Sequence, residues 1–260
     1  MIKRVLTLTA VLAGAAAFLF AQENKQPPPT VVVPKGKQIS AKERDAIKKI
    51  QDSKTPDDKI AAVDAFVTNF PDSTFKSPAL FEAAEAADSK GDYAKAVSYA
   101  KLSLESDNTR FDAMFLIAGE LAQHTQKFDL DKEQKLGEAE KYVKQGLDTM
   151  ATAPKPQGVS DSDWNGFKKE ETANAHRDLA LVASARTKWD VAVTEYKAAI
   201  DAAGQPDQVL MARLGNAYNE TGDYADAITI LNKVEGLPNL DPRVKAFADS
   251  ELSRAKKGGK

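Results

Sequence analysis

Histidine and cysteine are the side chains most often used for metal binding and for nucleophilic or acid–base chemistry, and this chain has few of them. Cysteine is absent, which excludes thiolate metal sites, disulfides and cysteine nucleophiles. The two histidines, His124 and His176, are far apart in the sequence. Because a zinc site needs several convergent ligands, we interpret each histidine as an ordinary structural or surface residue.

Carboxylates are abundant, but their spacing does not indicate an acid–base pair. Glu170–Glu171 and the pair Glu138/Glu140 are interpreted as solvated helix faces, because a general acid needs a dry pocket beside a substrate. The chain also lacks the phosphate-binding pattern G-x-x-x-x-G-K, the nucleophile pattern G-x-S-x-G and the zinc pattern H-E-x-x-H. We therefore expect no catalytic residue, no cofactor and no metal, in a protein that is not an enzyme.

The overall charge is nearly balanced, with 36 lysines and arginines against 38 aspartates and glutamates. Binding to the phosphates of a nucleic acid requires a basic surplus, so we expect no nucleic-acid partner. Hydrophobic residues make up 42% of the chain, which is enough for a globular core.

The first twenty-one residues have the order of a secretory signal peptide. Lys3 and Arg4 precede an apolar run from Val5 to Phe20, and Ala21 offers a small residue for cleavage. About 16 residues at 1.5 Å each span roughly 24 Å, less than the ~30 Å hydrocarbon core of a bilayer. We expect cleavage and no membrane span in the mature protein, with retention as an anchor as the alternative.

Residues 22–39 contain four prolines among polar residues, which is typical of a flexible spacer. It is either an unstructured tail or a tether. A lipoprotein is excluded, because Ala21-Gln22 occupies the place where its acylated cysteine would stand. The expected location is therefore periplasmic or secreted.

Helix signals begin at Ser40 and continue to the C-terminal region. Ser40 and Glu43 have the spacing of a capping box, and Thr55-Pro56, Ser77-Pro78 and Asp241-Pro242 each place a capping oxygen before a proline. These patterns predict an N-terminal helical pair over residues 40–70 and a capping helix over 243–255.

An internal repeat is the strongest signal in the sequence. Residues 91–97 (GDYAKAV) recur as 222–228 (GDYADAI), residues 188–193 form a degenerate copy, and residues 127–129 start another. Thirty-five residues separate the aromatic positions in two independent pairs, which is close to the ~34-residue period of helix-turn-helix repeats. These periodic aromatics are Tyr93, Phe128, Trp189 and Tyr224, and we expect them to pack in the core. Trp164 lies outside the period and is either a loop anchor or an exposed contact.

At these residues the chain resembles the tetratricopeptide repeat family. Leu214-Gly215 and Tyr218 would lie on a first helix, Gly222-Asp223-Tyr224 would form the turn, and Ala227 would lie on the second helix. The resemblance implies an all-α fold, a right-handed α-solenoid of about four helical hairpins with flanking N-terminal helices and a C-terminal capping helix. The domain would span residues 40–256, with units 77–110, 111–160 with an insertion, 161–204 and 206–239, and a tail at 257–260. The insertion would hold a helix that ends near Met150 and a loop over 153–158.

The resemblance further implies a concave groove lined by the first helix of each hairpin, which would bind a protein or peptide partner. The residues placed in this putative groove are Glu85, Asp88, Glu120, Gln123, His124, Asn174, Arg177, Asn216, Asn219 and Glu220. Their carboxylates would favour a partner with some positive charge. They are alternatively polar residues that only keep the groove hydrated.

The hypothesis that follows is an exported, non-enzymatic adaptor or scaffold, working in a bacterial cell-envelope assembly. One alternative is a membrane-tethered structural organiser that keeps its N-terminal segment. A glycan-processing envelope enzyme on a helical scaffold is a further alternative, although 260 residues leave no room for a catalytic domain beside the repeats. The sequence does not identify the partner or the oligomeric state.

Overall fold

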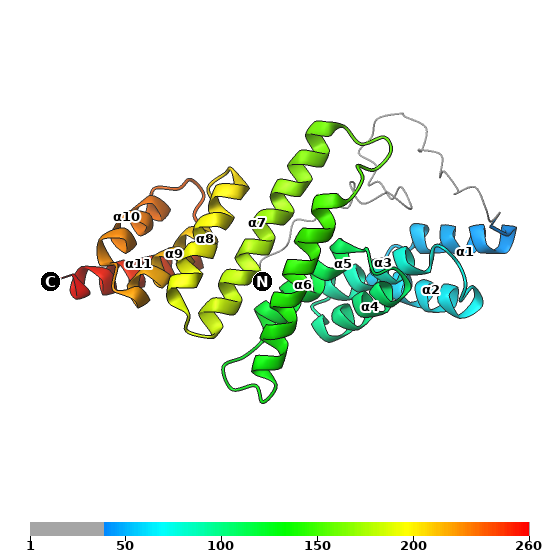
Figure 1. Cartoon of the computed structure of the whole chain (residues 1–260), viewed down its shortest axis with the longest axis horizontal. Helices are drawn as coiled ribbons and strands as arrows, with labels where there is room; N and C mark the ends of the chain where they lie inside the picture. The colour runs from blue at the N-terminus through cyan, green and yellow to red at the C-terminus, as the bar shows by residue number, and fades with distance from the viewer. Residues whose placement is uncertain (1–38, 260) are drawn as a thin grey trace. The chain divides into compact units, whose positions relative to one another are not determined.

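The computed structural model describes residues 39–259. This part of the chain is all-helical and contains no strand, as the sequence predicts (Figure 1). Its helices are α1 (Ala41–Asp52), α2 (Pro56–Asn69), α3 (Lys76–Ser89), α4 (Tyr93–Ser106), α5 (Phe111–His124), α6 (Lys132–Thr152), α7 (Asp161–Ala185), α8 (Trp189–Ala203), α9 (Gln208–Thr221), α10 (Tyr224–Glu235) and α11 (Pro242–Gly258). The proposed signal peptide and nearly all of the spacer lie outside the described residues.

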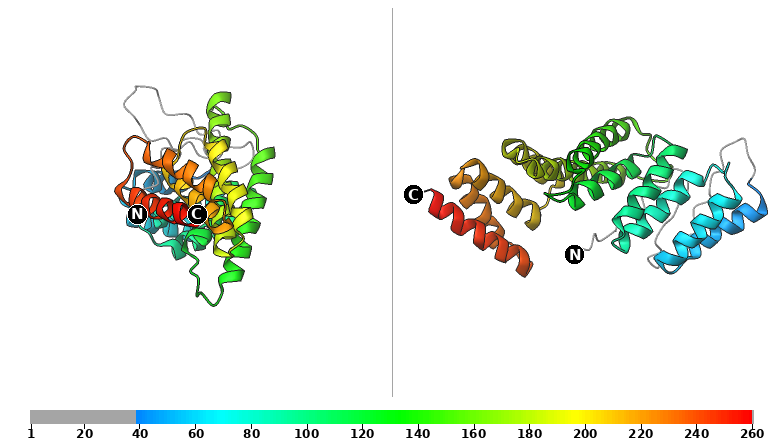
Figure 2. Two further views of the ribbon diagram at one scale, coloured as in Figure 1. Left: turned by 90° about the vertical axis from the view of Figure 1, so that its left-hand side faces the viewer. Right: turned by 90° about the horizontal axis from the view of Figure 1, so that it is seen from below.

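The chain divides into two compact units. In the described residues, the first unit holds 39–120 and 148–167, and the second holds 121–147 and 168–259. Within each unit, consecutive helices joined by short turns pack side by side as antiparallel pairs (Figures 1 and 2). None of the helices in residues 39–259 combines the length and apolar content that a membrane crossing requires.

The N-terminal pair α1 and α2 begins at the two caps expected from the sequence. The Ser40 hydroxyl accepts a hydrogen bond from the Glu43 amide, and the Thr55 hydroxyl accepts one from the Asp58 amide, each at 3.1 Å. The Glu43 carboxylate does not return a bond to the Ser40 amide. It accepts a hydrogen bond from the Ser73 hydroxyl at 2.6 Å, so this half of the capping box instead connects α1 to the segment before α3.

The predicted cap at Ser77 is wrong. α3 begins at Lys76, so Ser77 lies inside the helix, where its side chain is buried. Its hydroxyl lies 3.0 Å from the hydroxyl of Ser103 on α4, and each of the two hydroxyls donates to the other residue's carbonyl. The oxygen before Pro78 therefore connects the two helices of a hairpin rather than starting one, and the two polar groups satisfy each other in the interior.

The turns of three hairpins share one backbone conformation, which confirms the repeat seen in the sequence. Gly91, Thr187 and Gly222 all have positive φ. In each turn the amide of the next residue donates a hydrogen bond to a carbonyl of the preceding helix, five residues earlier in the chain. This left-handed residue terminates the first helix and directs the chain into the second. Thr187 adopts the conformation without being glycine, which is why this copy looks degenerate in the sequence.

Small residues let the two helices of the last hairpin approach closely. A Cβ atom added at Gly215 of α9 would lie 2.5 Å from Cγ of Leu231 on α10, so only glycine fits there. Ala227 of α10 is fully buried, as expected from the resemblance. The capping helix α11 then buries Ala248, Leu252 and Ala255 against the same core.

Trp164 is a buried anchor and not an exposed contact, which were the two alternatives left open by the sequence. It lies in the first turns of α7 with 6% of its surface exposed. Its ring stacks on Phe167 at 5.4 Å between centroids and lies 6.4 Å from Phe111 of α5. The start of α7 is thereby fixed onto the core of the first unit, just after the long 153–160 loop.

The expectation that all four periodic aromatics pack in the core is wrong for Phe128 and for Tyr93. The Phe128 side chain is 86% exposed, in the loop between α5 and α6, and Tyr93 is 43% exposed. Trp189 packs against the core around Tyr196, and Tyr224 packs against the core around Leu231. The match at residues 127–129 fails because α6 starts only at Lys132, so the chain does not turn into its second helix at Phe128.

Replacing Trp164 with alanine should lower the free energy of unfolding by about 3–5 kcal/mol, because the ring is buried among aromatic neighbours. The same change at Phe128 should have an effect within about 0.5 kcal/mol. Urea unfolding followed by circular dichroism compares the two variants. Equal losses would contradict the assignment of Trp164 to the core.

Candidate functional site

The ten predicted groove residues all lie on α3, α5, α7 and α9, which are the first helices of the hairpins. The first unit holds Glu85, Asp88 and Glu120, and the second holds Gln123, His124, Asn174, Arg177, Asn216, Asn219 and Glu220. Glu120 and Asn219 are buried, Gln123, His124 and Glu220 are exposed, and the others are half-buried. Each unit therefore has its own candidate surface.

The candidate surface of the first unit is a group of charged side chains from α2, α3 and the start of α5. Lys59 of α2 forms an ion pair with Glu82 of α3. Arg110, just before α5, binds both oxygens of Asp112, and its guanidinium lies over the Phe81 ring at 4.9 Å from the centroid. Bidentate pairing and stacking together hold Arg110 in one orientation.

Glu85 belongs to this group, and its pKa is strongly perturbed. It is one helical turn after Phe81, with its carboxyl almost wholly surrounded by protein atoms although the side chain keeps some contact with solvent. Desolvation raises the pKa of Glu85 to about 8, and the nearby charges of Glu82 and Asp112 act in the same direction. Lys59 and Arg110 oppose this shift without cancelling it.

We name this group the α3 acidic face: Lys59, Phe81, Glu82, Glu85, Arg110 and Asp112. The sequence predicted Glu85 as a groove residue but missed Lys59, Glu82, Arg110 and Asp112. The only available signal was the i+3 and i+4 spacing of Glu82, Glu85 and Phe81, which places them on one side of a helix. The arrangement can accept hydrogen bonds and positive charge, and it offers no nucleophile.

In the second unit, Arg177 of α7 lies among acids. It donates to Asp178 at 3.0 Å and to the Asn174 side chain at 2.9 Å. Burial alone would lower the pKa of Arg177, but the carboxylates of Asp178, Glu171 and Asp207 raise it above its usual value. Arg177 and Asn174, both predicted groove residues, are thus brought together, and their polar groups are engaged with neighbours on the same helix.

The two histidines have different environments. His176 faces α8, where its Nδ1 atom lies 2.7 Å from the Glu195 carboxylate, in agreement with the packing position expected for it. His124 is exposed at the end of α5. No group of three or more metal-binding side chains occurs in residues 39–259.

Two of the three predicted groove residues in the last hairpin contact α11, and Asn219 is buried by it, which corrects the expectation of an open surface there. Asn219 is 2% exposed and donates from its amide nitrogen to the Glu251 carbonyl and carboxylate. Glu220 pairs with Arg254 at 2.6 Å. The family geometry placed both residues on the groove side of α9, but this side is where the capping helix packs. Asn216 remains half-buried.

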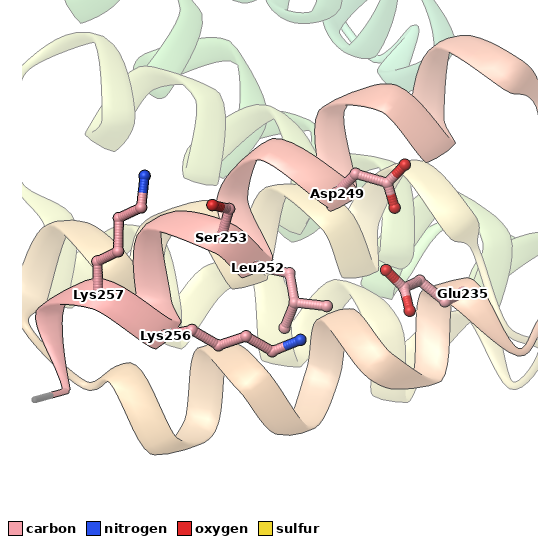
Figure 3. A pocket seen from close by; sticks show the side chains of 6 residues that line it. All are labelled: Glu235, Asp249, Leu252, Ser253, Lys256 and Lys257. Atoms are coloured by element: carbon pink, nitrogen blue, oxygen red, sulfur yellow. The ribbon is translucent and has the colours of Figure 1, made fainter.

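A shallow hollow lies between α10 and α11 (Figure 3). The Glu235 and Asp249 carboxylates face each other across it, and Lys256 extends along it while Lys257 points away. A hydrogen bond from Lys245 lowers the pKa of Asp249. Because Asp249 is paired with Lys245 on the surface, the hollow resembles an ordinary solvated seam between two helices.

Comparisons with known proteins agree with this architecture. Family models described as tetratricopeptide repeat match residues 77–110 and residues 177–242. The chain is similar in structure to a thermophilic tetratricopeptide repeat protein of Thermus thermophilus, with 14% identity, a TM-score of 0.53, and coverage of 76% of this chain and 91% of that one. A tetratricopeptide repeat protein of Parabacteroides merdae matches at 12% identity with a TM-score of 0.37, covering 84% and 91%. No curated protein sequence matches the chain.

The described residues thus define an all-α protein of tandem antiparallel helix pairs. The chain contains tetratricopeptide repeats over residues 77–110 and 177–242, as both family matches show and as the recurring turns agree.

Glu85→Gln should change how stability depends on pH. The pKa of Glu85 is raised from 4.5 to about 8 in the folded protein, so between these values the folded state binds more protons than the unfolded chain. The free energy of unfolding of the wild type should therefore fall as the pH rises from about 5 to about 8. Glutamine does not titrate, so the variant should lose less stability, by roughly 2 kcal/mol after allowance for residual solvent contact. Urea unfolding at pH 5, 6.5 and 8 measures the free energy of unfolding of both proteins. The same dependence on pH in the wild type and in Glu85→Gln would contradict the raised pKa of Glu85.

Proposed function

We propose that this protein is an exported adaptor that binds an extended segment of another protein on the first helices of its hairpins. The observation that carries the proposal is the α3 acidic face, where the Glu85 carboxyl is desolvated without a hydrogen bond in the described residues. Perturbed acids concentrate at functional sites. A bound partner would supply the hydrogen bond that the Glu85 carboxyl lacks.

The repeats support the adaptor role, because stacked helix pairs offer a preformed surface on which an extended segment can bind without remodelling the protein. Packing within the hairpins already fixes the side chains of this surface. Arg110, for example, is held by Asp112 and by the Phe81 ring. Little conformational entropy would then be lost at the surface on binding.

Export rests on the N-terminal sequence. Lys3, Arg4 and the uncharged run from Val5 to Phe20 have the order of a signal peptide, and Ala21 provides a cleavage residue. The protein would then act in the cell envelope of a bacterium or outside the cell. Leu19 is larger than the residue usually found at its place in a cleavage site, and this favours the second candidate, an organiser that keeps residues 1–21 as an anchor.

Photo-crosslinking tests the proposed binding surface. A benzoylphenylalanine at Asp88, one turn beyond Glu85, should give a discrete crosslinked species in the native envelope. The same probe at Ser98, which is exposed on α4, should give no crosslinked species. Glu85→Lys should abolish the crosslink through charge reversal, whereas the matched change Glu105→Lys on α4 should preserve it. A crosslink that survives Glu85→Lys would place the partner elsewhere.

The N-terminus of the exported protein distinguishes the adaptor from the anchored organiser. Mass spectrometry of the mature product is expected to find Gln22 as the first residue, because Ala21 is the only small residue directly after the apolar run. Recovery of the intact N-terminus in a membrane fraction would instead support the organiser.

A further inference from the structure

The loop between α5 and α6, residues 125–131, presents two large apolar side chains to solvent. Phe128 is 86% exposed and Leu130 is fully exposed, more than any other large hydrophobic side chain of the described residues. The loop extends past the start of α6 (Figure 1). Because covering apolar side chains is favourable, two of them within three residues of a protruding loop indicate an interaction surface.

Hydrogen bonds and an ion-pair network give this loop a defined conformation. The Gln126 amide donates to the Asp129 carboxylate at 3.1 Å, and the amides of Asp129 and Lys132 donate to the carbonyls of Gln126 and Asp129, each at 3.2 Å. The Lys135 ammonium, in the first turn of α6, lies 3.1 Å from the Asp129 carboxylate and 2.9 Å from that of Asp131. Since these polar groups already have partners within the protein, the loop loses little when it leaves water.

The charges around the apolar pair favour an anionic partner. Of the three acids in the loop and the first turn of α6, two share one lysine, as described above, and the third, Glu133, pairs with Arg186 of α7 at 2.8 Å. Lys127 and Lys132, on the two sides of the apolar pair in the sequence, form no ion pair within the described residues. The Lys127 ammonium lies over the neighbouring aromatic ring, 5.5 Å from its centroid. Both lysines therefore remain able to bind an anion.

We propose that this loop binds the surface of an anionic lipid bilayer, with Phe128 and Leu130 inserted below the headgroups and Lys127 and Lys132 against the lipid phosphates. Apolar side chains together with lysines are typical of segments that lie in a membrane interface. Each basic residue close to an anionic surface strengthens the attraction. An apolar pocket in a protein would cover the two apolar side chains without giving either lysine a counter-charge.

The contact is expected to be weak and reversible, because even a single myristoyl chain gives only marginal binding to a bilayer. Since part of the attraction is electrostatic, it should weaken when the salt concentration is raised from about 0.1 M to about 0.5 M. The loop belongs to the second unit and the α3 acidic face to the first, so this inference does not depend on the proposed peptide-binding function.

A dye placed in the loop of the full chain tests this inference. The natural chain has no cysteine, so Gln126→Cys, at an exposed position, takes a nitrobenzoxadiazole dye at one site only. Vesicles of phosphatidylcholine and phosphatidylglycerol at about 7:3 should shift the emission of this dye to shorter wavelength, because water is excluded from the loop. The same dye at Ser98→Cys on α4 should show no shift. Each dye reports only its own surroundings, so binding of residues 1–21 to the vesicle does not produce the difference.

Substitutions in the labelled protein separate the two parts of the contact. Phe128→Ser combined with Leu130→Ser should raise the lipid concentration at half-maximal signal at least tenfold. Lys127→Gln combined with Lys132→Gln should raise it about tenfold on the anionic vesicles and leave the weaker binding to pure phosphatidylcholine unchanged. Val191→Ser, which removes a half-exposed apolar residue from α8, should behave as the wild type. Circular dichroism should find the same helical content in all of these variants.

The inference is overturned if the dyes at positions 126 and 98 respond equally, or if the double serine variant keeps the half-maximal lipid concentration of the wild type. It is also overturned if the loop gives no signal on vesicles while a benzoylphenylalanine at position 128 crosslinks to a protein in the native envelope, because the loop would then occupy a protein pocket. All of these outcomes leave the peptide-binding surface on α3 untouched.

Discussion

The close contact between the two helices of each hairpin is the constraint on which the rest of this structure depends. A small residue stands at the same place in the second helix of three hairpins, three positions after the aromatic residue of the turn: Ala96, Ala192 and Ala227, each fully buried. In the last hairpin the first helix also needs glycine, because a Cβ at Gly215 would collide with Leu231. In all three hairpins the first helix is terminated by a left-handed residue at Gly91, Thr187 or Gly222.

This packing determines which side chains remain for function. One side of α3 is used against α4, and charged side chains gather where α3 meets α2 and the start of α5. Glu85 shows the result: its pKa is raised because burial desolvates its carboxyl, and the charges of Glu82 and Asp112 act in the same direction. The candidate site is therefore a consequence of helix stacking, with Arg110 contributed by the short connection before α5.

The sequence correctly predicted the helix caps and turns that depend on local chemistry. The caps at Ser40, Thr55 and Asp241 and the turns at Gly91 and Gly222 follow from residue type and spacing, and all are found. The errors concern residues whose surroundings come from distant segments. Ser77 has the pattern of a cap but contacts Ser103. Phe128 has the spacing of a core aromatic but lies in the loop before α6, and Asn219 has a groove position that α11 covers. Tertiary packing determines the surroundings of each of these residues, and such packing cannot be deduced from a single sequence.

The most direct test of helix register uses the buried contact between Ser77 and Ser103. Their hydroxyl oxygens lie 3.0 Å apart, so cysteines at both positions should meet at disulfide distance. The natural chain has no cysteine, so the double variant can form only this one intramolecular bond. The account predicts that mild oxidation of the folded protein joins the two positions nearly quantitatively, as peptide mass spectrometry would show, with the helical content unchanged. Two cysteines that stay reduced in the folded protein would contradict the pairing of α3 with α4, and with it the surface on which the proposed function depends.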